Sequence, residues 1–76
     1  MTVKIENIAN AIANRRRSIG ITQAELARRS GVGLCTICNI EQLLGYPRLD
    51  TACLIAQGLG VPLSVLIKEA EDDGNA

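Results

Sequence analysis

Two short helical patterns separated by Gly31 constrain the fold of this chain more than any other feature. The first pattern opens at Thr22, whose hydroxyl can accept the amide proton of Glu25 while the Glu25 carboxylate reaches back. Gly31 follows this pattern directly, at a point where a turn of positive φ favours a residue without a β-carbon. The second pattern runs over about residues 34–43. Residues 22–41 are therefore predicted to form two short helices joined by a tight turn.

The second helix of this pair has one apolar side and one outward side. At about 100° per residue, Ile37 and Ile40 lie together with Leu44. A polar-to-apolar strip lies on the opposite side and consists of Cys35, Cys38, Asn39 and Gln42. A helix with one buried side, held by a preceding helix across a tight turn, is the layout of a helix-turn-helix. The second helix of such a motif can enter the major groove of DNA.

The rest of the chain predicts three further helices. Apolar residues recur at three- and four-residue steps over about 4–19, which indicates an amphipathic first helix. Residues 49–59 predict a fourth helix, and Pro62 suits the first turn of a fifth. We expect an all-α, compact five-helix bundle that forms one domain over residues 1–70. The polar segment 71–76 is predicted to be a disordered acidic tail.

Composition agrees with packed helices and argues against several other classes of protein. Hydrophobic residues make up 47% of the chain but include one aromatic residue, Tyr46, and such an aliphatic core suits interlocking helices. Three cysteines without disulfide spacing predict a reducing cytoplasmic location, and no stretch resembles a signal sequence or a membrane span. The chain lacks histidine, a phosphate-cradling glycine loop and paired carboxylates. We therefore expect no enzymatic activity, metal, cofactor or small-molecule substrate.

The net charge of zero hides an asymmetry along the chain. Up to residue 48, seven basic residues stand against three acidic ones, an excess of +4. From residue 49 onward, one basic residue stands against five acidic ones, an excess of −4. The basic part coincides with the predicted helix-turn-helix, which favours binding to a polyanion such as DNA. Charges that only keep the surface soluble are the alternative explanation.

A set of residues in register extends this pattern over nearly the whole chain. Its members are Arg16 four residues before Gly20, Thr22-Gln23, Leu26-Ala27, Gly31-Val32, Thr36-Ile37, Ile40-Glu41, Pro47, Leu49 and Leu59-Gly60-Val61. In this set the chain resembles the Cro/cI-type helix-turn-helix family, the phage-repressor-like DNA-binding domains, over about residues 8–67. The resemblance implies a repressor-like bundle. It also implies a sequence-specific transcriptional regulator, most simply a repressor, that binds a pseudo-palindromic DNA operator as a homodimer.

The third helix departs from the family at both of its ends. Gly33 and Leu43 stand where relatives often carry a polar N-cap and a helix-ending glycine. The helix predicted over about 34–43 is therefore free to end at another residue. The resemblance still implies DNA binding, but it does not imply a particular operator.

The resemblance and side-chain chemistry together assign the DNA contacts. Base reading is assigned to the outward side of the third helix, namely Leu34, Cys35, Cys38, Asn39 and Gln42. Asn39 and Gln42 can each pair bidentately with adenine, whereas the other three side chains offer apolar or weakly polar contact. Phosphate contacts are assigned to Gln23, Arg28, Thr36, Tyr46 and Arg48. Arginines that are only solvated, and a Tyr46 that covers the edge of the core, are the alternatives.

Two further assignments concern the scaffold. Arg16 and Glu41 match a pair that forms an internal ion pair in many relatives, so we expect them to tie the first helix to the end of the third. The last helix carries more apolar residues than one packed side needs. We assign part of this surface to a dimer interface made of Val65, Leu66 and Ile67, with a simple monomer core as the alternative.

Cys35 and Cys38 form a single C-x-x-C pair with two interpretations. They are either ordinary exposed thiols or a redox or metal switch on the DNA-facing side. A closed zinc site needs four ligands, and only Cys53 remains elsewhere in the chain. The weak hydrogen-bonding capacity of the reading side also keeps a second function open, a protein-interaction module of the antitoxin or anti-repressor type on the same fold.

Overall fold

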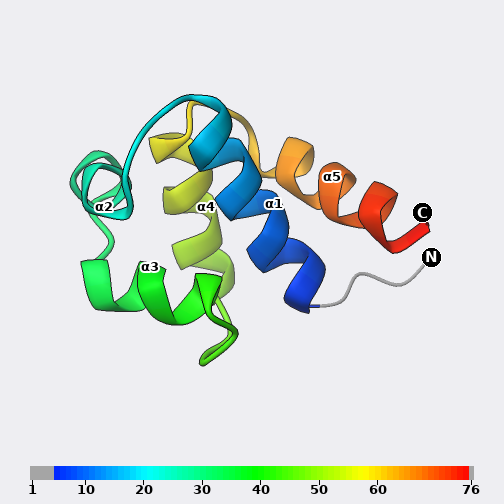
Figure 1. The fold of residues 1–76 in the computed structure, drawn as a ribbon. Coiled ribbons are helices and arrows are strands. Elements are labelled where there is room, and N and C mark those ends of the chain that lie inside the picture. The colour runs from blue at the N-terminus through cyan, green and yellow to red at the C-terminus, as the bar shows by residue number, and fades with distance from the viewer. Residues whose placement is uncertain (1–4, 76) are drawn as a thin grey trace.

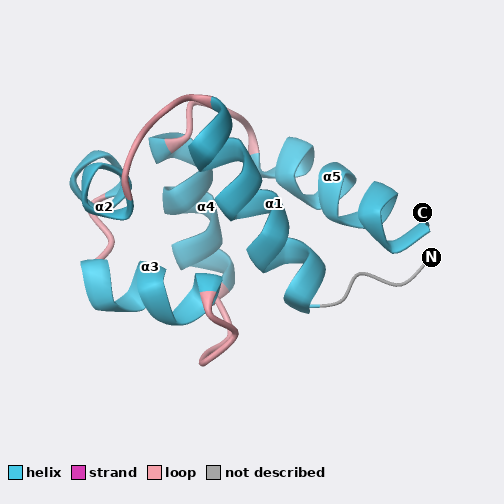
Figure 2. Ribbon diagram, in the orientation of Figure 1, coloured by secondary structure: helices cyan, strands magenta, loops and turns pink. Residues whose placement is uncertain are grey.

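The computed structural model describes residues 5–75, which form five helices joined by turns (Figure 1). The helices are α1 (Ile5–Ser18), α2 (Gln23–Ser30), α3 (Leu34–Glu41), α4 (Leu49–Gly58) and α5 (Leu63–Asn75). The described part of the chain contains helices and connecting turns but no strand (Figure 2). The all-α, five-helix architecture predicted from the sequence is therefore confirmed. Residue 4, which the sequence assigns to the first helix, lies outside the described residues.

One hydrophobic core joins all five helices. Figure 1 shows α2 and α3 together at one end of the molecule, with α4 and α1 between them and α5. α1 packs chiefly on α5, and α2 packs chiefly on α4. Each helix contributes one of the largest fully buried side chains, which are Ile12, Leu26, Ile37, Ile55 and Leu66. Because these side chains belong to one cluster, the α2–α3 pair is fixed to the frame formed by α1, α4 and α5.

Local hydrogen bonds define both ends of α2. Thr22 is the N-cap, and its side-chain oxygen accepts the amide proton of Glu25 at 3.1 Å. The Glu25 carboxylate does not complete the expected capping box, because it accepts hydrogen bonds from Arg28 and Arg29. Gly31 ends the helix with φ 76°, in the left-handed region, and its amide donates to the Ala27 carbonyl. The predicted tight turn between α2 and α3 thus lies at Gly31.

A missing side chain allows α2 and α4 to pack closely. A β-carbon added at Gly58 would lie 2.9 Å from Cβ of Ser30 and 3.1 Å from Cδ1 of Leu26. The Ser30 hydroxyl meanwhile accepts the amide proton of Val32 at 3.2 Å, within the turn that leads to α3. The close contact at Gly58 therefore sets how the helix-turn-helix sits on the frame.

α3 ends earlier than the sequence predicts. Its last residue is Glu41, and the amide of Leu44 donates to the Asn39 carbonyl at 2.7 Å while that of Leu43 donates to the Ile40 carbonyl at 3.2 Å. These two bonds form a Schellman motif, which normally places a glycine in the left-handed region. Leu43 takes that conformation here, with φ 64°. A leucine in this region costs about 1–2 kcal/mol relative to a right-handed conformation.

α5 begins later and extends further than expected. Pro62 precedes its first residue, and the Pro62 carbonyl accepts the amide proton of Val65 at 3.0 Å. The helix continues to Asn75, so the structure has helical turns over most of the segment predicted as a disordered tail, and Ala76 lies outside the described residues. An ion pair between Arg15 and Glu69 joins α5 to α1.

No single described helix is both long and apolar enough to cross a membrane. α4 and α5 together reach that length and composition over Leu49–Gly58 and Leu63–Asp72, but a bend of 99° separates them. The apolar side chains of this pair include Ile55 and Leu66, which are buried in the core of the bundle.

Candidate nucleic-acid interface

α3 has one side fixed in the core and one side open to solvent. Ile37 and Ile40 are buried in the core cluster. The exposed residues of the helix and its cap are Leu34, Cys35, Thr36, Asn39 and Gln42. Cys38 is half-buried. Four of the five residues assigned to base reading thus lie on the open side of α3, and the fifth lies at its edge.

An ion pair joins the C-terminal end of α3 to α1. Nε of Arg16 donates to Oε2 of Glu41 at 2.9 Å, and Nη2 donates to Oε1 at 3.0 Å. The third guanidinium nitrogen donates to the backbone oxygen of Ile21 at 2.9 Å. The two side chains are only 12% and 5% exposed. The structure thus brings the predicted pair together in a bidentate, largely buried geometry that fixes both partners.

This pair also perturbs the titration of both groups. Burial alone would raise the pKa of the Glu41 carboxyl, but hydrogen bonds from Arg16 and Gln23 outweigh burial and hold that pKa below its ordinary value of 4.5. The hydrogen bond to Glu41 raises the pKa of Arg16 in turn. Both side chains are therefore charged at neutral pH, as a persistent ion pair requires.

Gln23 lies in this network rather than at the free surface. Its Nε2 donates to Oε1 of Glu41 at 3.0 Å, and its Oε1 accepts a hydrogen bond from Sγ of Cys38 at 3.1 Å. The amide assigned to a phosphate contact is thus held on both sides by α3. Cys38, assigned to base reading, directs its thiol toward α2. The sequence carries no signal for this contact, because it depends on how α2 and α3 cross.

The other residues assigned to phosphate are exposed. Arg28 pairs with Glu25 within α2, and Nε of Arg48 lies 3.5 Å from a carboxylate oxygen of Asp50. Hydrogen bonds from Arg28 and Arg29 lower the pKa of Glu25. Exposed pairs of this kind contribute little to stability. Tyr46 is 82% exposed, and the alternative in which it covers the edge of the core is wrong.

The predicted dimer residues are divided between the core and the surface. Leu66 is 1% exposed and packs at the centre of the bundle, so its assignment to an interface is corrected. Val65 and Ile67 are half-buried because the same helix must also cover α1. The surface near Ile67 includes Leu49, the first residue of α4, which is 75% exposed. Sequence reasoning did not assign this residue to a surface, because an apolar residue at the start of a helix gives no signal of its exposure.

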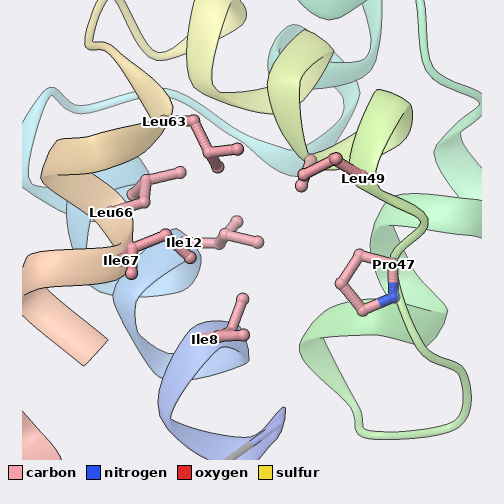
Figure 3. Close-up of a pocket in the computed structure, with 8 residues that line it drawn as sticks. Ile8, Ile12, Pro47, Leu49, Leu63, Leu66 and Ile67 are labelled. Carbon is pink, nitrogen blue, oxygen red and sulfur yellow. The ribbon is translucent and has the colours of Figure 1, made fainter. Parts of the chain in front are cut away.

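An apolar pocket of about 210 Å³ lies beside Leu49. Figure 3 shows side chains directed toward it from α1, α5, the start of α4 and the preceding loop. Those labelled are Ile8, Ile12, Pro47, Leu49, Leu63, Leu66 and Ile67. The lining contains no titratable side chain, so the pocket offers apolar contact rather than a reactive site.

The cysteines are free thiols. Cys35 is exposed, whereas Cys38 and Cys53 are half-buried. Within residues 5–75, no three His, Cys, Asp or Glu side chains gather closely enough to hold a metal ion. The C-x-x-C pair therefore has no further protein ligand beside it in the described part of the chain.

Comparison with known proteins identifies the fold and the family. Two crystal structures of the restriction-modification controller protein C.Esp1396I are similar to this chain. A mutant form has a TM-score of 0.86 and 25% identity, over 91% of this chain and 90% of that one. The wild-type form has a TM-score of 0.80 and 26% identity, over 95% and 99%.

Sequence comparison is consistent with these structures. No curated protein matches the chain. A helix-turn-helix family model matches residues 12–66, which include all of α2, the turn, α3 and α4. The chain therefore belongs to the Cro/cI-type helix-turn-helix family and is a DNA-binding transcription regulator.

Proposed function

We propose that the protein is a repressor that binds a pseudo-palindromic operator as a homodimer, with α3 of each copy in the major groove. The observation that carries this proposal is the open side of α3. Leu34, Cys35, Asn39 and Gln42 are exposed there while the opposite side is anchored by Ile37, Ile40 and Glu41. A rigid helix with an uncommitted outer surface is what reading of base edges requires.

The dimensions and chemistry of α3 fit the major groove. An α-helix with its side chains is about 10–12 Å across, and the groove is about 12 Å wide. The amides of Asn39 and Gln42 can each donate to and accept from an adenine edge, and Leu34 can contact a thymine methyl group. Thr36, Arg28, Arg48 and Tyr46 are exposed and supply candidate contacts to the flanking phosphates.

A second copy of the chain gives the operator its symmetry. The molecule measures 32 × 23 × 20 Å, and it contains one reading helix. Successive major grooves on one side of the duplex are about 34 Å apart, so one copy reads a single half-site. Ile67 and the exposed Leu49 line the same apolar pocket on the frame, and this surface supports pairing of two copies. Val65 lies about 200° from Ile67 around α5 and therefore faces another side.

The proposed regulator acts where an operator overlaps a promoter, because a bound dimer then excludes the transcription machinery. The likeness to a restriction-modification controller favours such a gene cassette as its setting among the contexts that use this fold. This role places the protein in the cytoplasm with the DNA.

Selection of bound sequences from a random duplex library, under reducing conditions and at two salt concentrations, tests the proposal. We expect enrichment of a two-fold symmetric site with half-sites about one helical turn apart, and a steep loss of affinity with salt. The Asn14→Ala variant is a matched control, since Asn14 is exposed on α1 beside Arg15 and Glu69, on the side where α1 meets α5. It should select the same site.

Failure of this selection has a defined meaning. If no sequence is enriched, or if binding to duplex DNA is insensitive to salt, the operator-binding proposal is contradicted. The alternative of a protein-interaction module would then explain the exposed Leu34 and Cys35 better.

A further inference from the structure

We propose that Cys35 and Cys38 form a thiol–disulfide switch on α3 that lowers specific DNA affinity when a peroxide oxidises the pair. The inference rests on the proposed function, because it regulates the same reading side of α3. Three observations carry it: the positions of the two thiols on the helix, the hydrogen bond that Cys38 makes to α2, and the weakly held start of α3.

The two cysteines stand at a separation that a disulfide can bridge. They are three residues apart on one helix, which places their Cα atoms about 5 Å from each other. Disulfides join residues whose Cα atoms are about 4.4–6.8 Å apart. Their Cβ atoms lie about 5–6 Å apart in a regular helix, whereas a disulfide requires about 3.5–4.5 Å. Closing the bond therefore tightens the first turns of α3.

The start of α3 is the part of the helix that can change conformation when the disulfide forms. Its N-cap is Gly33, which makes no side-chain capping bond, and Leu34 and Cys35 are exposed. The other end is fixed by the buried Ile40 and by the ion pair of Glu41 with Arg16. Oxidation thus distorts the segment that presents Leu34 and Cys35 to bases while the rest of the bundle keeps its packing.

Oxidation also breaks a contact between α2 and α3. Sγ of Cys38 donates a hydrogen bond to Oε1 of Gln23 at 3.1 Å, and the same amide donates to Glu41. A disulfide sulfur carries no proton, so the bond from Cys38 to Gln23 is lost whenever the disulfide forms. The thiol form alone completes the hydrogen-bond chain that sets the position of α2 against α3.

The chemistry is balanced by one molecule of hydrogen peroxide. The exposed Cys35 sulfur attacks the O–O bond to give a sulfenic acid and one water molecule. The Cys38 sulfur then attacks the Cys35 sulfur, the S–S bond forms, and the sulfenic hydroxyl leaves as a second water with the thiol proton. A dithiol reverses the step by thiol–disulfide exchange, and exposed or strained disulfides are the readily reduced ones.

The switch changes shape without changing charge. A thiol and a disulfide are both uncharged, so the number of phosphates neutralised by Arg28, Arg48 and their neighbours is unaffected. Affinity for the selected site should fall by about tenfold or more, the scale of losing one or two base contacts. The slope of affinity against salt, and affinity for an unrelated duplex, should stay constant.

The test compares the full chain in its reduced, peroxide-treated and dithiol-rescued forms on the selected duplex and on an unrelated duplex of equal length. Peptide mass mapping should locate a disulfide between Cys35 and Cys38, and far-ultraviolet circular dichroism should show that the helical bundle is retained. We expect selective loss of affinity for the selected site and full recovery with dithiol. Cys53→Ser, on α4, should behave as the unmodified chain does.

Several outcomes overturn the switch. The first is a mapped Cys35–Cys38 disulfide without loss of DNA affinity. The second is a disulfide that instead involves Cys53 or links two chains. The third is a loss of DNA affinity when the double variant Cys35→Ser/Cys38→Ser is treated with peroxide, relative to its own untreated form. In each of them the reduced protein still binds its duplex. A reduced protein that binds no duplex instead contradicts the proposed function, and the switch with it.

Discussion

The inner and outer sides of α3 are held in place to very different degrees. On the inner side, Ile37 and Ile40 are buried in the core, and Glu41 accepts hydrogen bonds from both Arg16 and Gln23. On the outer side, Asn39 and Gln42 are exposed to solvent. The same eight-residue helix therefore has an inner side whose residues the fold requires and an outer side whose residues make no contact that the fold requires.

The energies of the two sides explain this division. Burying one isoleucine stabilises a fold by about 1.5–3 kcal/mol, and breaking a buried ion pair costs about 3 kcal/mol or more. Substituting an exposed residue away from such contacts usually changes stability by less than about 0.5 kcal/mol. Substitutions of the outer residues of α3 should therefore cost little stability, whereas the inner residues preserve the position of the helix.

The largest expected effect concerns the inner side. Glu41→Ala removes both hydrogen bonds to Arg16 and leaves a guanidinium that is only 12% exposed without its carboxylate. We expect a loss of about 3 kcal/mol in the free energy of unfolding, measured by urea denaturation. Glu25→Ala is the matched control, because its partners Arg28 and Arg29 are exposed, and it should cost much less. Equal losses in the free energy of unfolding for Glu41→Ala and Glu25→Ala would contradict the distinction between the buried pair and the exposed pairs.

The same ion pair predicts a dependence of stability on pH. The pKa of Glu41 is lower in the folded state than its ordinary value of 4.5, so its contribution is present above that value and is lost as the pH falls through the folded pKa. The raised pKa of Arg16 keeps that group charged over the whole range. The stability difference between the unmodified chain and Glu41→Gln should shrink as the pH falls below about 5 and through the lowered pKa of Glu41. A constant difference would refute this account.

On the outer side, Asn39→Ala and Arg28→Ala should act on different properties of DNA binding. Asn39→Ala should relax specificity at one base position, at a cost of about 1–3 kcal/mol for the preferred base. Arg28→Ala should weaken binding to all sequences and reduce the salt slope by about one. Binding to duplexes with single substitutions, at several salt concentrations, separates the two. Equal weakening of all sequences by Asn39→Ala would show that Asn39 reads no base.

The smallest expected effect concerns Leu43, which follows the C-terminal end of α3. Leu43 has φ 64°, so Leu43→Gly should relieve strain and raise the free energy of unfolding by about 0.5–1 kcal/mol after the entropic cost of glycine. Leu44→Gly is the control, because Leu44 lies outside the left-handed region and should only lose stability. Thermal unfolding of both variants tests this, and a destabilised Leu43→Gly would contradict it.

Sequence reasoning succeeded where a feature depends on residues close together in the chain. Thr22, Glu25 and Gly31 specify the ends of α2 through bonds of three or four residues, and the periodic isoleucines of α3 identify its buried side. The contact between Arg16 and Glu41 spans 25 residues, and only the resemblance to the family pointed to it.

Features that depend on how helices cross were not predictable in this way. Leu66 and Leu49 are both apolar residues of predicted helices, but the sequence pattern does not reveal that the first is buried at the centre of the bundle and that the second is 75% exposed. The hydrogen bond from Cys38 to Gln23 likewise depends on how α2 and α3 cross, which periodicity along the chain does not specify. The early end of α3 depends on a leucine in an unfavourable conformation, which no propensity indicates.

Protection of Cys35 by DNA tests the central claim, that the outer side of α3 contacts the duplex, most directly. The full chain is alkylated with iodoacetamide, with and without excess duplex, and the rates at Cys35 and Cys53 are followed by peptide mass mapping. We expect the duplex to slow alkylation of the exposed Cys35 on α3 and to leave the rate at Cys53 on α4 unchanged. An unchanged rate at Cys35 in the DNA-bound protein would contradict it.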